Sequence, residues 1–259
     1  MGSAGRTGVN YTCWRVLSVG LFPRRHIVSL WLKRWHDHTV GLIISSMSIQ
    51  YIHLTTPTPR EWAQIEQIYT ESFLPAERDP FPVITEGVEH SSLMLLAAQN
   101  GADVIGLALV TPLLDIPVLF LPYLAIHSDY RGQGVGGGLF RFMIEWLTEE
   151  IDSTALVWEV EPAPPDDPTH NRSRRIRFYE RSGADLIPMT NSYRMPNLET
   201  GIGALPLWLM WIPLRGERRP LEKSEVIAWV EAIYRTDYPD HMDLCAQIVE
   251  DIQKWEAPD

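Results

Sequence analysis

Residues 118–149 constrain the fold more than any other part of the chain, because an apolar run, a glycine-rich turn and a helical pattern follow one another there. Residues 118–126 predict a buried strand, and residues 135–149 carry apolar side chains at helical spacing. Glycines between them let backbone amides approach a phosphate, and the following helix adds unpaired N–H groups and the positive end of its dipole. The segment predicts a strand–loop–helix unit that binds a pyrophosphate.

Strand and helix patterns surround this unit from Met47 onward. The other predicted strands lie at 49–54, 93–98, 104–111, 155–160 and at about 185–195 and 204–214. The other predicted helices begin near Thr58 and at 82 and 172, and two more lie within 221–256 on either side of Tyr238-Pro239. Strands and helices in this order predict a mixed α/β domain with one central βαβ unit, and they do not fit a repeated doubly wound pattern.

Two kinds of phosphate loop compete for the glycines. Residues 132–137 formally satisfy G-x-G-x-x-G, and Glu159 stands at a tolerable distance for a ribose contact in a dinucleotide site. A dinucleotide loop starts directly at the strand end, however, whereas five residues, 127–131, intervene here. A nucleoside-triphosphate loop is excluded, because no lysine follows the glycines.

The second interpretation is an acetyl-CoA loop. Residues 131–136, Arg-Gly-Gln-Gly-Val-Gly, fit the pattern Gln/Arg-x-x-Gly-x-Gly/Ala, and residues 178–184, Phe-Tyr-Glu-Arg-Ser-Gly-Ala, are similar to a Tyr-Glu-x-x-Gly-Phe helix end. With these motifs and its element order, the chain over residues 49–214 resembles the GNAT superfamily of acyl-CoA-dependent N-acyltransferases. Ala184 departs from the aromatic residue usual in that family.

The resemblance implies a fold and a cofactor site. The fold is a mostly antiparallel mixed sheet, flanked by helices, in which strands 118–126 and 155–160 run parallel and splay apart. Acetyl-CoA, the co-substrate, would place its pantetheine arm in that wedge and its pyrophosphate on the glycine loop. The residues implied in binding are Leu124, Ala125, Ile126, Arg131, Gly132, Gln133, Gly134, Val135, Gly136 and Gly137.

Two residues are candidates for acid–base chemistry, because amine acylation needs a base for the amine proton and an acid for the departing thiolate. Glu159 is an acid inside an apolar strand, where burial would raise its pKa, and it sits where some family members carry a catalytic glutamate. The alternative is a surface residue on an edge strand, and Glu161 is the reserve candidate. Tyr179 matches the family tyrosine that reaches the CoA sulfur, with a packing role as the alternative.

Charge and cysteine content bound the remaining functions. The net charge is −11, which argues against nucleic-acid binding, and no apolar run is long enough to span a membrane. Only Cys13 and Cys245 are present, which favours a reducing, cytoplasmic compartment. His127 and His170 are isolated, and no metal site is expected.

Residues 1–46 differ from the rest of the chain. Six basic residues against one acid give them a charge of +5, which leaves −16 on residues 47–259. We expect residues 1–46 to be a poorly ordered basic extension, with a targeting role left open. Residues 47–215 are expected to form the acetyltransferase domain and residues 216–259 a C-terminal helical extension.

The predicted function is transfer of an acetyl group from acetyl-CoA to an amine by direct attack. A small-molecule or peptide amine is expected as acceptor, with a cationic one favoured by the acidic domain. A homodimer is compatible with the sequence. The alternatives are a non-catalytic acyl-CoA-binding module on the same fold and, less favoured, a dinucleotide-binding enzyme.

Overall fold

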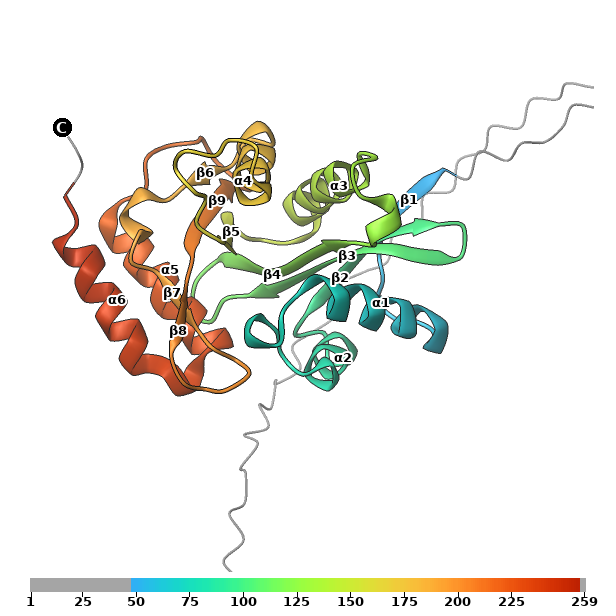
Figure 1. Ribbon diagram of the computed structural model, residues 1–259, viewed down its shortest axis with the longest axis horizontal. Coiled ribbons are helices and arrows are strands. Elements are labelled where there is room, and N and C mark those ends of the chain that lie inside the picture. Colours follow the sequence, from blue (N-terminus) through green and yellow to red (C-terminus); the bar gives the residue numbers. More distant parts are fainter. Residues whose placement is uncertain (1–47, 257–259) are drawn as a thin grey trace, which may run out of the picture. The chain divides into compact units, whose positions relative to one another are not determined.

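The computed structural model describes residues 48–256, and the expectations for residues 1–46 lie outside this range (Figure 1). The strands of the described range are β1 (Ile49–His53), β2 (Met94–Asn100), β3 (Asp103–Pro112), β4 (Val118–Ile126), β5 (Ala155–Val160), β6 (Asp185–Leu186), β7 (Arg194–Pro196), β8 (Ala204–Pro206) and β9 (Trp208–Pro213). The helices are α1 (Pro59–Ser72), α2 (Phe81–Glu89), α3 (Val135–Glu150), α4 (Asn171–Arg181), α5 (Lys223–Asp237) and α6 (Met242–Lys254). Short 3-10 helices are η1 (Pro75–Glu77), η2 (Ser128–Tyr130), η3 (Pro188–Thr190) and η4 (Pro239–His241).

Local sequence signals set the ends of several helices. Thr58 caps α1, and the Thr58 and Glu61 side chains form a reciprocal capping box ahead of Pro59. Gly183 follows α4 with a φ of +94°, the left-handed backbone that commonly terminates a helix. The helix therefore ends where the glycine predicts.

Seven strands form one sheet in the order β1-β2-β3-β4-β5-β9-β6. Every neighbouring pair is antiparallel except β4 and β5, which run parallel. The predicted fold class, a mostly antiparallel sheet with one parallel pair and flanking helices, is confirmed.

Helices cover both faces of this sheet (Figure 1). On one face, α3 and α4 bury Leu139, Phe140 and Ile176 in a cluster with β2–β5 and β9. On the opposite face, α1 and α2 pack against β2–β4, and α5 and α6 pack against β5 and β9. The strand register shows that the two helix pairs share this face. Leu107, Leu109 and Thr111 of β3 point to the same face, and the first two belong to the α1–α2 cluster. Phe120 of β4 is the register partner of Thr111 and belongs to the α5–α6 cluster.

An irregularity in β4 shapes the middle of the sheet. Leu109 pairs with Tyr123 and Thr111 pairs with Phe120, so two residues of β4, Leu121 and Pro122, lie opposite a single residue of β3. A bulge of this kind bends its strand and re-aims the side chains that follow. It coincides with the point where β4 leaves β5.

The two strands predicted at about 185–195 and 204–214 are wrong in their extent. The first is β6, followed by η3 and then β7, and the second is divided into β8 and β9. β7 and β8 form a separate two-stranded sheet. Proline has no N–H for a ladder, and Pro188 begins η3 while Pro206 is the last residue of β8.

The C-terminal helices belong to the same hydrophobic core as the sheet. Val226, Val230 and Ile233 of α5 are fully buried together with Val157 and Leu209 of the sheet. Residues of α6 join the same cluster. The described residues, 48–256, accordingly group as one compact unit.

We expect Ile233→Ala to lower the free energy of unfolding of the whole unit by about 2–5 kcal/mol, because it leaves a cavity in a fully buried site. Ile227→Ala, a matched change at a partly exposed position of the same helix, should cost clearly less. Urea unfolding followed by circular dichroism measures both. A separate early transition confined to the α5–α6 helices would contradict this expectation.

Candidate active site

A cavity opens where β4 and β5 separate. The two strands pair at only three positions, from Val118 with Ala155 to Phe120 with Val157, and both continue beyond that point. The cavity has a volume of about 460 Å³. It is lined by residues of α1, η1, β4, β5, α4 and the β7–β9 segment, among them Phe73, Glu77, Leu124, Ile126, Arg131, Glu159, Glu161, Asn171, Arg175, Tyr179, Met195 and Leu207.

The main chain of β4 faces this cavity at alternate residues. His127 N–H donates to the Ile105 carbonyl of β3 at 2.9 Å. Since main-chain groups alternate along an antiparallel strand, Ala125 is directed toward β3, whereas Leu124 and Ile126 are directed toward the wedge. Of the three β4 residues predicted to meet pantetheine, these two therefore present N–H and C=O groups to the cavity.

The glycine loop ends in left-handed backbone at the start of α3. Gly132 has a φ of +74° and Gly134 a φ of +84°, and a Cβ at either position would meet no atom within 4 Å. Within the described chain, the N–H groups of residues 132–137 have no hydrogen-bond acceptor. These six amides, at the positive end of the 16-residue helix α3, form a ready anion site.

Two polar side chains of the loop brace it. Arg131 donates from Nε to the Ile126 carbonyl at 2.8 Å and from a terminal nitrogen to Ser72 Oγ at 3.1 Å. Gln133 donates to the Asp129 carbonyl at 2.6 Å. Both side chains were predicted to meet the cofactor. In the structure they hold the loop against β4 and α1, and Arg131 also lines the cavity.

Gly138, the last of the glycines, is needed for packing. A Cβ there would lie 1.9 Å from the hydroxyl oxygen of Tyr51 on β1. The glycine-rich stretch therefore divides into a segment that leaves amides open, 132–137, and one position that lets α3 approach the edge of the sheet.

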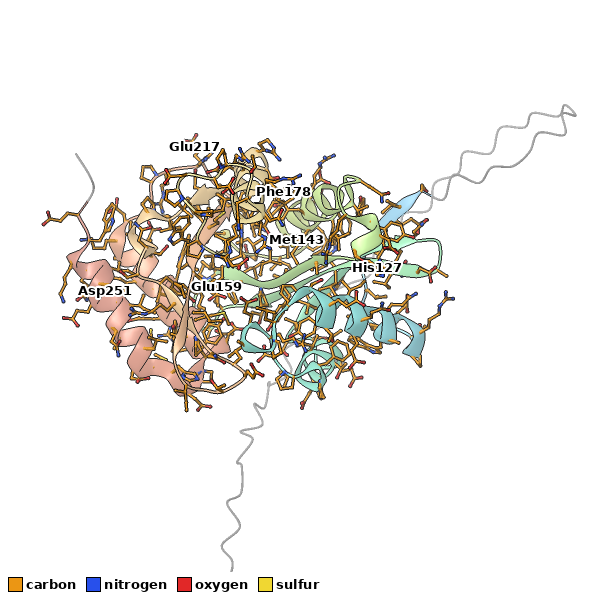
Figure 2. All side chains as sticks on the ribbon, in the orientation of Figure 1. His127, Met143, Glu159, Phe178, Glu217 and Asp251 are labelled. Carbon is orange, nitrogen blue, oxygen red and sulfur yellow. The ribbon has the colours of Figure 1, made fainter. Side chains whose placement is uncertain are left out.

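Glu159, on β5, is half-buried and lines the cavity (Figure 2). Its Oε1 accepts a hydrogen bond from the Tyr193 hydroxyl at 2.6 Å. The Tyr238 hydroxyl lies 3.3 Å from Oε1 and 3.1 Å from Oε2. The carboxyl group is thus held by two phenols while it remains in contact with the cavity.

The surroundings of Glu159 weaken it as an acid. Burial raises its pKa to about 7 from an ordinary value of 4.5, the hydrogen bonds from Tyr193 and Tyr238 oppose that rise, and the nearby Glu77 carboxylate adds to it. A carboxyl with this pKa is partly ionised near neutral pH. That is the range in which a group accepts and releases protons most effectively as a general base.

Tyr179 reaches the same cavity from the other side of the sheet. It is buried among Phe140, Trp158 and Phe178, with ring centroids 5.0–5.3 Å from its own. Burial raises its pKa to about 12, although the Arg175 guanidinium lowers it in part. Within the described residues its hydroxyl has no hydrogen-bond partner, and at neutral pH the phenol keeps its proton and is available as a donor.

Glu161, the reserve candidate, is held by arginines. Its two carboxylate oxygens pair with Arg172 at 2.7 Å and with Arg175 at 2.9 Å. These contacts tie the end of β5 to α4. Glu161 lines the cavity as well, but its lone pairs are engaged by fixed cations.

Sequence reasoning missed Tyr193 and Tyr238. Tyr238 lies 79 residues from Glu159 along the chain, and no local spacing connects the two. The Tyr238-Pro239 pair was recognised only as a break between two helices. Tyr193 falls in a segment predicted to be a strand, so its role as an inward donor was not visible.

Two further findings concern metals and membranes. Between residues 48 and 256, no three His, Cys, Asp or Glu side chains are grouped as a metal ion would require. His170 instead caps α4 by accepting from the Arg172 amide. In the same range, none of the helices combines the length and apolar character of a membrane span.

The central segment of the chain matches a known protein family. Residues 62–184, which hold the wedge, the glycine loop and Tyr179, match the model of the Acetyltransferase (GNAT) family. This segment is similar to a GNAT acetyltransferase domain. Among curated proteins, none matches the chain in sequence.

Solved structures of GNAT proteins share the fold. A protein from Bacteroides thetaiotaomicron described as an acetyltransferase of the GNAT family is 21% identical over 74% of this chain and 98% of its own, with a TM-score of 0.57. An aminoglycoside 6′-N-acetyltransferase complexed with coenzyme A is 14% identical over 66% of this chain and 99% of its own, with a TM-score of 0.50. The predicted resemblance to GNAT enzymes is confirmed.

The raised pKa of Glu159 predicts a pH-dependent stability. Between about pH 4.5 and 7 the unfolded chain releases this proton while the folded chain retains it, so rising pH favours unfolding until the folded group has also ionised near pH 7. The free energy of unfolding of the wild type, relative to Glu159→Gln, should therefore fall by about 3 kcal/mol across this pH window. Above about pH 7 the difference should stay constant.

Urea unfolding at a series of pH values measures this difference. Glu66→Gln, on an exposed face of α1, is the control for removing one carboxylate. Parallel stability curves for wild type and Glu159→Gln from pH 4 to 8 would show that Glu159 has an ordinary acidity.

Proposed function

We propose that this protein transfers the acetyl group of acetyl-CoA to an amine by direct attack within the β4–β5 wedge. One observation carries the proposal: a single cavity brings together the open main chain of β4, a carboxyl with a pKa near neutrality and a protonated buried phenol. The glycine loop, residues 132–137, follows β4 after the short helix η2. The similar aminoglycoside acetyltransferase was solved with coenzyme A, which supports the choice of cofactor.

The glycine loop would receive the pyrophosphate. Its six N–H groups have no acceptor in the described chain, and the positive end of α3 favours a dianion there. The pantetheine amides would then extend along β4 and exchange hydrogen bonds with Leu124 and Ile126. A second cavity, of about 440 Å³ between α3 and α4, borders Gly137 and carries Arg141 and Arg181 against one acid, Glu145. Its place and charge suit the nucleotide end of CoA.

The reaction needs two proton transfers. The amine nitrogen attacks the thioester carbon, the C–S bond breaks and an amide forms. Glu159 would take the amine proton, directly or through a water molecule, and Tyr179 would donate its phenolic proton or hydrogen bond to the departing thiolate. Their positions suit these roles, since Glu159 has the parity of Val157, on the α5–α6 face, whereas Tyr179 belongs to the α3–α4 face.

The acceptor that we propose is a cationic amine. Glu77 lines the cavity, and its pKa is raised by burial and then by the Glu161 carboxylate. Glu77 in turn raises the pKa of Glu159. An ammonium group that approaches these carboxyls would stabilise their ionised forms. It would lose one proton to water before the attack, and Glu159 would take the second as the amide forms. Small-molecule amines and peptide N-termini both meet this requirement.

The cytoplasm is the compartment that we propose. Cys245 is a free, buried thiol, as expected for a chain that works under reducing conditions.

We expect acetyl-CoA to raise the melting temperature and NAD to leave it unchanged, because the loop and the open β4 main chain together fit a pantetheine nucleotide. Gly134→Val should abolish the shift, since a β-branched residue is strained at a φ of +84° and would displace the amides. Gly201→Val, at a φ of +66° in the β7–β8 hairpin, is the matched control and should keep the shift. Differential scanning fluorimetry measures all four cases, and stabilisation by NAD alone would contradict the cofactor assignment.

Tyr179→Phe should lower kcat by a factor on the order of 10² and leave acetyl-CoA affinity nearly unchanged, because it removes the donor and keeps the ring packing. Tyr51→Phe, on the edge strand β1, is the control for losing a phenol and should keep kcat. Release of CoA thiol across a panel of mono- and diamines gives the rates. Normal turnover in Tyr179→Phe would show that the thiolate leaves without this proton.

A further inference from the structure

Two tyrosines outside the family-matched segment hold the carboxyl group of Glu159. Tyr193 is fully buried and precedes β7, and Tyr238 is 6% exposed and follows α5. The matched segment ends at residue 184, so both lie beyond it. Their hydroxyls converge on one carboxyl group from two separate parts of the C-terminal third of the chain.

The backbone fixes both tyrosines in place. Tyr193 N–H donates to the Thr190 carbonyl at 2.9 Å, and its own carbonyl accepts from Leu207 N–H at 3.0 Å. Tyr238 N–H donates to the Tyr234 carbonyl at 3.0 Å, as the last bond of α5 before Pro239 ends the helix. Neither hydroxyl can leave Glu159 without a change in these turns or a rotamer change in a packed interior.

The tyrosine rings also support each other. The ring of Tyr234 packs edge-on against Tyr193, with centroids 6.2 Å apart, and against Tyr238, with centroids 5.3 Å apart. The Tyr234 hydroxyl donates to the Arg194 carbonyl and not to Glu159. Three neighbouring phenols therefore have similar packing, but only two of them contact the carboxyl group.

We propose that Tyr193 and Tyr238 are positioning residues for Glu159, and that α5 and α6 thereby form part of the active site. The inference rests on the proposed function, in which Glu159 is the base. A glutamate carboxyl rotates broadly about its last torsion, and two donors restrict that rotation. Oε1 accepts from both phenols, whereas Oε2 has a single contact at 3.1 Å and keeps acceptor capacity for a proton from the cavity.

The hydroxyls also keep Glu159 ionisable. Burial favours its neutral form, and a protonated carboxyl cannot accept a proton from the amine. Hydrogen bonds donated by the two phenols favour the carboxylate and oppose that effect. Three other titratable groups are coupled by charge to Glu159: Glu77 on η1, and Tyr234 and Asp237 on α5.

The C-terminal helices supply one of the two donors. Tyr238 stands at the end of α5, whose buried residues share a cluster with Val157 and Leu209, the neighbours of Glu159 on the sheet. A domain that ended after β9 would lack Tyr238 and the apolar cover on this face. The two helices therefore do more than extend the fold.

The experiment compares Tyr193→Phe and Tyr238→Phe with the control Tyr234→Phe in the full-length chain. For each active-site variant we expect the acidic limb of the pH–kcat profile to move up by about one unit, the effect of one hydrogen bond to a charged group. At pH 6.5 kcat should fall about tenfold and should recover toward the wild-type value at higher pH. KM for acetyl-CoA should stay unchanged. In Tyr234→Phe the acidic limb of the pH–kcat profile should lie at the same pH as in the wild type.

An infrared titration reads the carboxyl without turnover. The protonated-carboxyl band of Glu159 is isolated as the difference between each background and the same background with Glu159→Gln. The pH at which this band reaches half its intensity, its midpoint, should rise in Tyr193→Phe and Tyr238→Phe and stay unchanged in Tyr234→Phe. Unchanged midpoints in both variants, or an equal shift in the control, would overturn the inference.

The two measurements separate the inference from the proposed function. If no amine in the panel is acetylated but the midpoints move as expected, the proposed function fails and the tyrosines still set the state of Glu159. If acetyl transfer proceeds and the midpoints do not move, the function stands and the positioning role is wrong.

Discussion

Buried backbone groups need hydrogen-bond partners, and the divergence of β4 from β5 removes those partners in the middle of a folded sheet. After Phe120 the bulge at Leu121-Pro122 turns β4 away, and the main chain of Leu124 and Ile126 no longer meets a neighbouring strand. Arg131 supplies one replacement donor, to the Ile126 carbonyl. The remaining groups face a cavity, and an extended amide-bearing molecule is the kind of ligand that completes such a strand. A bound cofactor would thus take the place of the neighbouring strand that β4 lacks at Leu124 and Ile126.

The same divergence makes the wedge a passage between the two faces of the sheet. Tyr179 and the glycine loop lie with α3 and α4 on one face, and Glu159 has the parity of Val157, which packs against α5 on the other. A thioester carbon placed in the wedge would therefore meet the acid from one side and the base from the other. This separation lets each group keep its own acidity: Glu159 has a pKa near 7 and Tyr179 one near 12, and no carboxylate lies among the causes of the tyrosine's shift.

The parts of the fold that local patterns encode were predictable. The strand–loop–helix unit, α1 with its cap and the stop of α4 at Gly183 all depend on residues close together in sequence. The parallel, splayed pair was predicted only through the family resemblance. Two features were out of reach for a physical reason. Pro188 begins η3, which interrupts the first closing strand, and Pro206 is the last residue of β8, so neither segment continues as one strand. The Tyr238–Glu159 contact depends on how α5 docks on the sheet, which no short-range spacing specifies.

The docking of α5 and α6 also bears on the strength of the base. Glu159 owes its raised pKa first to burial, and the apolar cluster that buries it includes residues of both helices. Without that cover, water would solvate the carboxylate and its pKa would return toward the ordinary value. Tyr238, on the same segment, acts in the opposite direction by donating to the carboxyl group. The C-terminal segment thus raises the pKa of Glu159 by excluding water and lowers it through the Tyr238 hydrogen bond. The pKa near 7 reflects the balance of these two effects. Ionisation of Glu159 inside the fold lowers the free energy of unfolding at neutral pH, and the apolar contacts of the same two helices offset that loss.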